Sequence, residues 1–235
     1  MTRVKERVQE NPRTVSLVFQ SDLRAYPGQF GMLWLPGVDE KPYSISGIAP
    51  LMVTVSRVGP FSEALAALQP GDSVGVRGPF GTGWPVAPGR ALLVGGGYGA
   101  APLHFLARSL LAAGGSVEAA LGARSAADIL FADRFGRLGV PLRLATEDGS
   151  SGMKGRVTDV VEPLLATGRF DRLCACGPEP MLARLEVICR AAGVPAELSH
   201  EAYMRCGIGI CGACEHEGRL VCMDGPVFSI GRGAG

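Results

Sequence analysis

The chain has 235 residues, enough for two ordinary domains or for one domain with a small appendage. Hydrophobic residues make up 47% of it and charged residues 19%, a balance that describes a well-buried globular protein and excludes extended disorder. Lys and Arg number 23 against 22 Asp and Glu, so there is no electrostatic footprint for nucleic acid or for an anionic membrane. We therefore expect a protein or a small molecule as the partner.

The N-terminal residues 1–19 alternate charged and apolar side chains, which is not the pattern of a signal peptide. The most apolar stretch, Ala91 to Leu111, is interrupted by four glycines, Pro102, His104 and Arg108. A membrane-spanning helix does not readily tolerate these residues. The sequence thus predicts a cytoplasmic protein without a membrane span.

The first part of the chain has the pattern of short strands separated by turn clusters such as Tyr26-Pro27-Gly28. Strands of this kind predict an antiparallel sheet closed into a small barrel. The predicted strands are Arg3–Gln9, Thr14–Gln20, Gly31–Leu35, Met52–Val58 and Ser73–Arg77.

A Pro- and Gly-rich stretch, Gly78 to Gly89, is the candidate domain boundary, and strands alternate with helices beyond it. Apolar residues recur at helical spacing between Leu103 and Leu111 and between Met181 and Cys189. This alternation implies a parallel, doubly wound sheet. Its predicted strands are Ala91–Gly95, Ser116–Leu121, Pro141–Thr146 and Arg172–Cys176.

The last segment, from Glu201, is rich in Gly and Cys and too short to bury a core, so it needs a metal or covalent staple. The expected fold class is α+β multi-domain: an antiparallel β-barrel, then a doubly wound parallel α/β domain, then this small cysteine segment.

Four of the seven cysteines cluster near the C-terminus. Three have the C-x4-C-x2-C spacing of plant-type [2Fe-2S] sites, with glycines that let the backbone wrap the cluster. A structural zinc site is the alternative, although it more often shows two C-x2-C knuckles. The candidate ligands are Cys206, Cys211, Cys214 and Cys222.

A glycine run follows the predicted strand at Ala91 and precedes a helix, where a dinucleotide phosphate can meet helix N–H groups. Close packing of strand on helix without a ligand is the alternative explanation, but the position between strand and helix favours a nicotinamide dinucleotide. Cys176-Gly177-Pro178 ends another strand at the same edge, where ligands bind in such sheets, though a free Cys is also often merely buried. Arg124 stands where an acidic ribose ligand is expected, so the sequence leaves NAD and NADP open. The glycines concerned are Gly95, Gly96, Gly97 and Gly99.

Several stretches resemble one family. Lys41-Pro42-Tyr43-Ser44 is similar to the Arg-Pro-x-Ser flavin motif of ferredoxin-NADP reductase-like proteins, although Pro and Ser after a strand also suit a plain turn. Together with Gly78 to Gly83 and the cysteine segment, the chain most resembles the electron transfer subunits of class B dihydroorotate dehydrogenases. Lys41 departs from the motif's Arg and loses its planar fork, and the gap from Cys214 to Cys222 is shorter than the family's.

The resemblance implies FAD in residues 1–88, NAD in residues 89–200, and a [2Fe-2S] cluster in residues 201–235 that faces an FMN-containing catalytic subunit, in a heterotetramer. Electrons from dihydroorotate would then reach NAD⁺ through the cluster and FAD, as a step of pyrimidine biosynthesis. Ser44 would bond the flavin, Cys176 would lie near the nicotinamide, and the FAD phosphates would meet Ser56, Arg57, Val58 and Ser62.

Two alternatives remain at this stage. The same modules serve subunits of sulfide dehydrogenases or ferredoxin:NADP oxidoreductases, and a zinc-stapled nucleotide-binding protein without turnover shares the same motifs. No residue is predicted to act as a general base, because the chemistry belongs to the cofactors.

Overall fold

The computed structural model describes residues 1–231, which form two compact units. Residues 1–83 and 202–226 make the first unit, and residues 84–201 and 227–231 make the second. The chain therefore leaves the first unit, builds most of the second, and returns to the first for the cysteine segment. No helix within residues 1–231 is long and apolar enough to cross a membrane.

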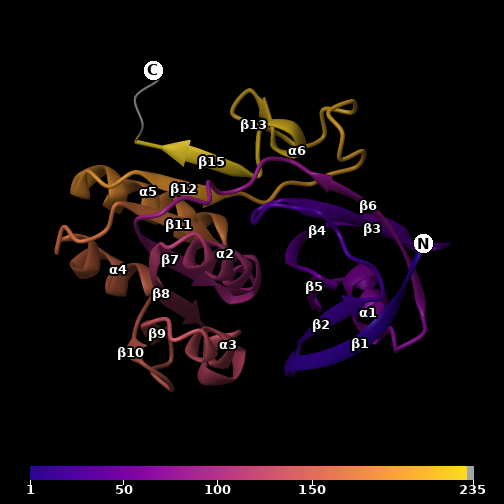
Figure 1. Ribbon diagram of the computed structural model, residues 1–235, viewed down its shortest axis with the longest axis horizontal. Helices are drawn as coiled ribbons and strands as arrows, with labels where there is room; N and C mark the ends of the chain where they lie inside the picture. The colour runs from indigo at the N-terminus through magenta and orange to yellow at the C-terminus, as the bar shows by residue number, and fades with distance from the viewer. Residues whose placement is uncertain (232–235) are drawn as a thin grey trace. The chain divides into compact units, whose positions relative to one another are not determined.

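Six antiparallel strands close into a barrel in the first unit (Figure 1). Their order around the barrel is β1-β2-β5-β4-β3-β6, and pairing of Thr2 with Val74 closes it. Alternate residues of these strands point inward, and the interior is filled by aliphatic side chains such as Leu17, Leu33 and Val55. The strands are β1 (Thr2–Asn11), β2 (Thr14–Phe19), β3 (Phe30–Leu35), β4 (Asp39–Ile48), β5 (Leu51–Ser56) and β6 (Ser73–Phe80).

One short helix, α1 (Pro60–Ala67), connects β5 to β6 and covers the barrel with Phe61 and Leu65. Proline at the start suits a helix because its missing N–H has no intrahelical partner there. The Ser62 hydroxyl accepts hydrogen bonds from the main-chain N–H groups of Val58 (2.9 Å) and Gly59 (3.0 Å) and fixes the turn that enters the helix.

The second unit is a seven-stranded sheet in the order β10-β9-β8-β7-β11-β12-β15, parallel except for β15. The chain winds outward from β7 in both directions, so a topological switch point lies between β7 and β11. The strands are β7 (Arg90–Gly96), β8 (Ser116–Ala123), β9 (Leu142–Thr146), β10 (Met153–Lys154), β11 (Arg172–Cys176), β12 (Ala196–Ser199) and β15 (Val227–Ile230).

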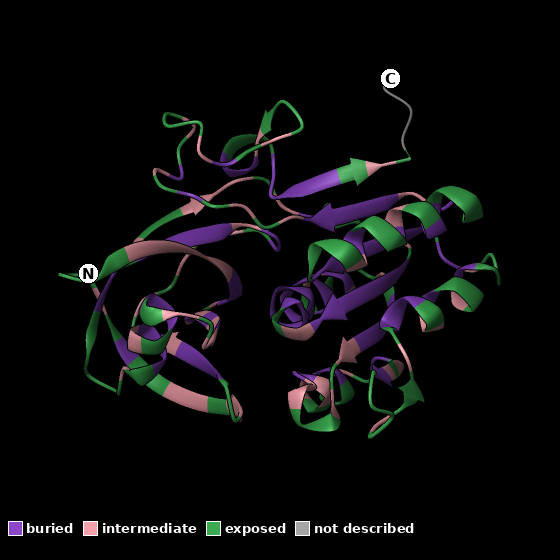
Figure 2. Ribbon diagram, turned by 180° about the vertical axis from the view of Figure 1, so that it is seen from behind, coloured by how far each residue is buried: buried purple, intermediate pink, exposed green. Residues whose placement is uncertain are grey.

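Helices cover both faces of this sheet. On one face α4 (Val157–Leu165) and α5 (Glu179–Ala192) bury a core that includes Leu92, Val94 and Leu173. On the other, α2 (Ala100–Ala112) packs against β7, β8 and β11, and its His104 ring meets the Phe135 ring of α3 (Ala132–Arg137). Figure 2 shows that the central strands β7, β11 and β12 are almost wholly buried, whereas the outer faces of the helices are exposed.

The predicted fold class is confirmed, with a barrel, a doubly wound sheet and a cysteine segment. In the barrel and the seven-stranded sheet, four strands were not among the predicted ones: β4, which contains Pro42, the two-residue strand β10, and the four-residue strands β12 and β15. Within residues 201–231, the predicted segment 201–235 contributes to both units, because β15 follows the cysteines and joins the sheet beside β12. Residues 232–235 of that prediction lie outside the described residues.

Candidate redox site

The cysteine segment of the first unit consists of a glycine-rich loop, the hairpin β13 (Glu215–His216) and β14 (Arg219–Leu220), and a helical turn, α6 (Val221–Asp224). Cys211 is exposed and Cys206 half-buried in the loop, whereas Cys214 and Cys222 are buried on either side of the hairpin. Of the seven cysteines, all of which lie in the described part of the chain, none forms a disulfide.

The four thiols of this segment form two pairs. Cys206 interacts with the side chain of Cys211, and Cys222 with that of Cys214. The N–H of Cys222 also points at the Cys214 sulfur, at 3.4 Å. Since each iron of a [2Fe-2S] centre takes two protein ligands, two neighbouring pairs are the arrangement that such a cluster needs.

Main-chain N–H groups converge on these sulfurs. Ile208 donates to the Cys206 sulfur at 3.4 Å and Gly209 to the Cys222 sulfur at 3.2 Å. Positive φ angles at Gly207 (72°) and Gly209 (78°) turn the loop in this way, which residues with a side chain rarely allow. The N–H groups of Ile208 and Cys211 lower the pKa of Cys206 to about 6, whereas burial raises that of Cys222 to about 11. The donor set, with N–H groups around its sulfurs, fits a [2Fe-2S] cluster.

The short gap between Cys214 and Cys222 is closed by the β13–β14 hairpin, in which Glu215 pairs with Leu220. Its two-residue turn has positive φ at Glu217 (49°) and Gly218 (77°), as a type I′ turn requires. The hairpin returns the chain so that Val221 donates to the Cys214 carbonyl at 3.1 Å. Eight residues are thus enough to bring Cys222 beside Cys214.

The predicted flavin motif lies on β4. Tyr43 is half-buried with its ring 6.2 Å from that of Phe61, and burial raises its pKa to about 12. Ser44 pairs with Phe30 in the ladder, and its hydroxyl has no hydrogen-bond partner in the described part of the chain, so it is available to a ligand. Lys41 is 2.6 Å from Asp39 and lies over the Tyr203 ring, so its charge is already partly neutralised.

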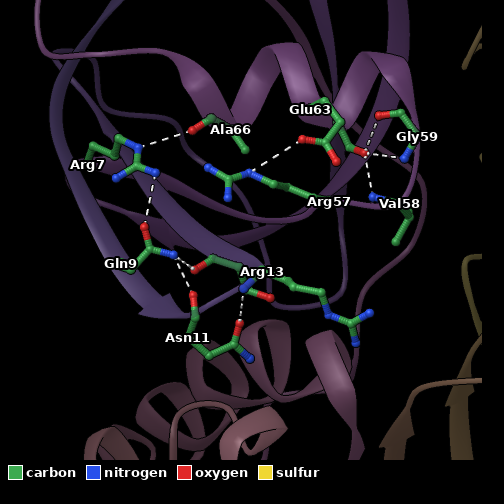
Figure 3. Close-up of polar contacts among 11 residues, drawn as sticks. Arg7, Gln9, Asn11, Arg13, Arg57, Val58, Gly59, Glu63 and Ala66 are labelled. Carbon is green, nitrogen blue, oxygen red and sulfur yellow. Dashed lines mark hydrogen bonds and ion pairs between the residues drawn. The ribbon is translucent and has the colours of Figure 1, made fainter.

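Of the predicted phosphate contacts, Arg57 and Val58 lie near the start of α1 (Figure 3). The hydroxyls of Ser56 and Ser62 are used inside the fold, bonded to Thr14 (2.8 Å) and to the Val58–Gly59 turn. Arg57 lies 3.7 Å from Glu63. What the site offers an anion is therefore the arginine together with the first N–H groups of α1, which have no intrahelical partner. A free serine beside an aromatic ring, near a helix N-terminus, fits FAD.

In the second unit, the glycine run and Cys176-Gly177-Pro178 lie side by side at the switch point, with Gly95 opposite Cys176. A Cβ at Gly96 would come within 2.8 Å of Pro178, and one at Gly99 would overlap the Cys176 carbonyl. These glycines are therefore required by packing, whatever they bind. The same edge is where dinucleotides bind in doubly wound sheets, so the residues also fit NAD.

Two residues at this edge were not predicted. The Tyr98 hydroxyl, inside the glycine run, donates to Glu201 at 3.1 Å, and burial raises the pKa of that carboxyl. Cys176 is buried, and burial followed by the Glu201 charge raises its pKa to about 12, so it is a neutral thiol rather than a thiolate. The one sequence signal that could have indicated Tyr98 as a site residue is its position inside the glycine run.

A third unpredicted residue follows β8. Asp128, in the turn η2 (Ala126–Asp128), accepts a hydrogen bond from the Ser125 hydroxyl at 2.9 Å. An acidic side chain therefore stands four residues after Arg124, in the turn that follows the second strand of this sheet.

Comparisons with known proteins agree on this architecture. The family model described as the iron-sulfur cluster binding domain of dihydroorotate dehydrogenase B matches residues 201–232. The structure of an NADH-dependent reduced ferredoxin-NADP oxidoreductase, solved in a study of flavin-based electron bifurcation, superposes with a TM-score of 0.89 at 30% identity. That likeness covers 97% of this chain and 88% of the other. Fold and site together define an oxidoreductase of the ferredoxin-NADP reductase-like class.

The curated relatives narrow this class. The chain is 42% identical over 228 residues to a probable dihydroorotate dehydrogenase B (NAD(+)) electron transfer subunit of Methanocaldococcus jannaschii, and 44% identical over 230 residues to that of Methanopyrus kandleri. Each match covers 96% of this chain and 88% of the relative. The chain belongs to the family of dihydroorotate dehydrogenase B electron transfer subunits, and the predicted resemblance is confirmed.

Proposed function

We propose that the chain passes electrons between an FMN-containing dihydroorotate dehydrogenase subunit and NAD⁺, through one [2Fe-2S] cluster and FAD, as a step of pyrimidine biosynthesis. The observation that carries the proposal is the pairing of four cysteines on the same unit as the flavin motif. When bound, FAD exchanges single electrons with the cluster and a hydride with the nicotinamide, while the protein supplies position and electrostatics.

The chain's own residues hold these groups. Cys206, Cys211, Cys214 and Cys222 ligate the cluster, and N–H groups of the loop stabilise the negative charge on its sulfurs. Lys41, Pro42, Tyr43 and Ser44 on β4 border the flavin ring. Residues 56–58 and Ser62 shape the turn that enters α1, and the first N–H groups of that helix together with Arg57 receive the FAD phosphates.

The nucleotide site occupies the carboxyl edge of β7 and β11, formed by residues 95–99 and 176–178. The neutral Cys176 thiol excludes water beside the nicotinamide without placing a charge there. Asp128 favours NAD over NADP, because a carboxylate suits a ribose hydroxyl and repels a 2′-phosphate. The predicted acceptor is therefore NAD⁺.

The partner is the catalytic subunit, bound as a heterotetramer at the cysteine loop. Large apolar side chains are exposed along this segment, and Ile210, between two cluster ligands, is 80% exposed. Exposed apolar groups of this kind mark protein interfaces when they cluster, and the others are Tyr203, Ile208 and Met223. We place the protein in the cytoplasm, where reducing conditions keep its thiols available as ligands.

A subunit of a ferredoxin:NADP oxidoreductase is the second candidate, because the bifurcating enzyme's structure covers 97% of the chain. Its sequence identity of 30% lies below the 42% of the dihydroorotate dehydrogenase relative, which favours the first candidate. The two differ in the partner, so co-purification separates an FMN-containing dihydroorotate dehydrogenase from a larger iron-sulfur flavoprotein.

The test is co-expression with the organism's own FMN subunit and an assay of NADH formation from dihydroorotate. NADH formation that requires both subunits supports the proposal. If the complex carries its flavins and iron but forms no NADH, the proposal is refuted. A Cys211→Ser variant should lose acid-labile sulfide, whereas Cys189→Ser, a buried cysteine of the second unit, should keep it. Stoichiometric zinc without sulfide in the unmodified chain would instead identify the zinc-stapled alternative.

A further inference from the structure

Arg77 of β6 binds the main chain of the first cluster cysteine. Its guanidinium donates through Nη2 to the carbonyl of Cys206 at 3.1 Å. The same group makes two parallel bonds to the Glu40 carboxylate, Nε to Oε1 and Nη2 to Oε2, both at 2.8 Å. A bidentate pair of this kind fixes the direction of the guanidinium, so the contact with Cys206 is geometrically defined.

The loop around Cys206 also rests on the barrel wall. A Cβ at Gly207 would come within 3.0 Å of the Met32 side chain, so the loop backbone lies directly against β3. The Arg77 guanidinium stacks 5.5 Å from the centroid of the Phe80 ring at the end of β6. Arg77 is thus held on three sides, by Glu40, by Phe80 and by the carbonyl it binds.

This arrangement places a fixed positive charge beside one iron ligand and pairs that charge with the Glu40 carboxylate. The Arg77 and Glu40 side chains are 42% and 24% exposed, so their field is partly screened by solvent. A nearby positive charge favours the form of a cluster that carries one more electron, since net charge and hydrogen bonds around the sulfurs set the potential of such centres.

We propose that Arg77, oriented by Glu40, is a positioning residue that anchors Cys206 and raises the reduction potential of the cluster. The inference rests on the proposed function, in that Cys206 must ligate a [2Fe-2S] cluster. Arg77 acts through the ligand Cys206, whose carbonyl it binds.

The two members of the pair should shift the potential in opposite directions. Arg77→Gln removes the positive charge and should make the cluster harder to reduce. Glu40→Gln leaves Arg77 without its counter-charge and should make it easier to reduce. We expect each change to alter the equilibrium constant for reduction about threefold, which corresponds to about 28 mV at 59 mV per tenfold for one electron.

A merely structural role predicts something else. Loosening the loop by either substitution would lower cluster retention in both variants, with no reason for opposite signs. Arg77→Lys keeps the positive charge but loses the planar guanidinium that binds Glu40 and Cys206 together. Compared with Arg77→Gln, it should therefore restore part of the reduction potential and a smaller part of the cluster retention.

The experiment is a redox titration of the full chain, carrying its cluster and flavin, followed by the electron paramagnetic resonance signal of the reduced cluster. Arg7→Gln is the matched control, because Arg7 lies on β1 and bonds to Gln9 and to the Ala66 carbonyl, with no contact to the cysteine segment in the described residues (Figure 3). Opposite shifts in the Arg77→Gln and Glu40→Gln proteins, reduced at 0.5 M salt and absent in Arg7→Gln, support the inference.

Unchanged potentials, or shifts of the same sign, overturn it. If Arg77→Gln does not retain a cluster, the Glu40→Gln protein is the test, because the inference requires its reduction potential to lie above that of the unmodified chain. Iron and sulfide analysis of the unmodified chain separates this result from failure of the proposed function, because a chain without a cluster refutes the function itself.

Discussion

His104 should make the second unit sensitive to mild acid. The side chain lies in α2, 7% exposed, between the edges of the Phe131 and Phe135 rings, at 5.5 and 5.4 Å between centroids. Its Nδ1 has no hydrogen-bond partner in the described part of the chain. Burial, followed by the charges of Arg134 and Arg108, lowers its pKa from 6.5 to about 4, against a hydrogen bond to the Arg134 main chain that acts the other way.

The sign follows from the direction of this shift. A histidine whose folded pKa is lowered contributes its full stability above 6.5 and loses it as the pH falls from 6.5 toward about 4, because the unfolded chain binds the proton first. At 1.36 kcal/mol per unit, the unfolding free energy should fall by about 2 kcal/mol between pH 7.5 and pH 5. His104→Leu removes this loss because a leucine does not titrate.

The assay is urea denaturation of the full chain and of His104→Leu at both pH values. Trp84, 2% exposed in the second unit, reports the unfolding in a Trp34→Phe background, since Trp34 belongs to the barrel. The wild type should lose about 2 kcal/mol more than the variant over this interval. If the unfolding free energies of the two proteins change with pH in parallel, within about 0.5 kcal/mol, the reasoning is refuted. Titration of His104 is the only difference between the two proteins that should depend on pH.

Two further substitutions test the packing of the second unit. Gly99→Ala places a Cβ into the Cys176 carbonyl, and we expect a loss of about 1–3 kcal/mol in thermal unfolding together with weaker NAD binding. The control is Gly136→Ala, whose Cβ meets no atom within 4 Å and which, like Gly99, has no positive φ. Trp84→Phe removes the donor that bonds the Glu197 carbonyl at 3.1 Å and should cost about 1 kcal/mol in urea unfolding. An unchanged midpoint in either protein contradicts the corresponding contact.

The helices and strands that the sequence predicts are those whose apolar residues recur with a regular period, because one face of the element is buried. Strands β1 and β2 alternate because one face is buried, and the apolar spacing of α2 and α5 follows from the helical period. Strand β12 escaped prediction because it is only four residues long and is buried throughout, including the charged Glu197. Strand β4 escaped because Pro42 interrupts an otherwise polar run.

The residues of the candidate site also fall into those that a local sequence pattern predicts and those that it does not. Spacing alone predicts the four cysteine ligands, since those residues lie close together in sequence. The contact of Arg77 with Cys206 joins residues 129 positions apart, and that of Tyr98 with Glu201 joins residues 103 apart. No local pattern indicates such pairs. Ser56 and Ser62 are the opposite case, in which the sequence suggested contacts that the fold already uses. Their motif suggests phosphate contacts, but both hydroxyls are hydrogen-bonded within the protein.

The β13–β14 hairpin shows where the cysteine segment tolerates a change of length. Cys214 and Cys222 meet at the base of the hairpin, and its turn at Glu217 and Gly218 lies at the far end, where the Gly218 N–H donates to the Glu215 carboxylate. Closing a flexible loop twice as long costs only about 0.6 kcal/mol more, which is small beside the free energy of metal–thiolate bonds. Residues can therefore be inserted at this tip without separating the two ligands. The tip is accordingly the position of choice for an affinity tag or a spectroscopic label near the redox centre.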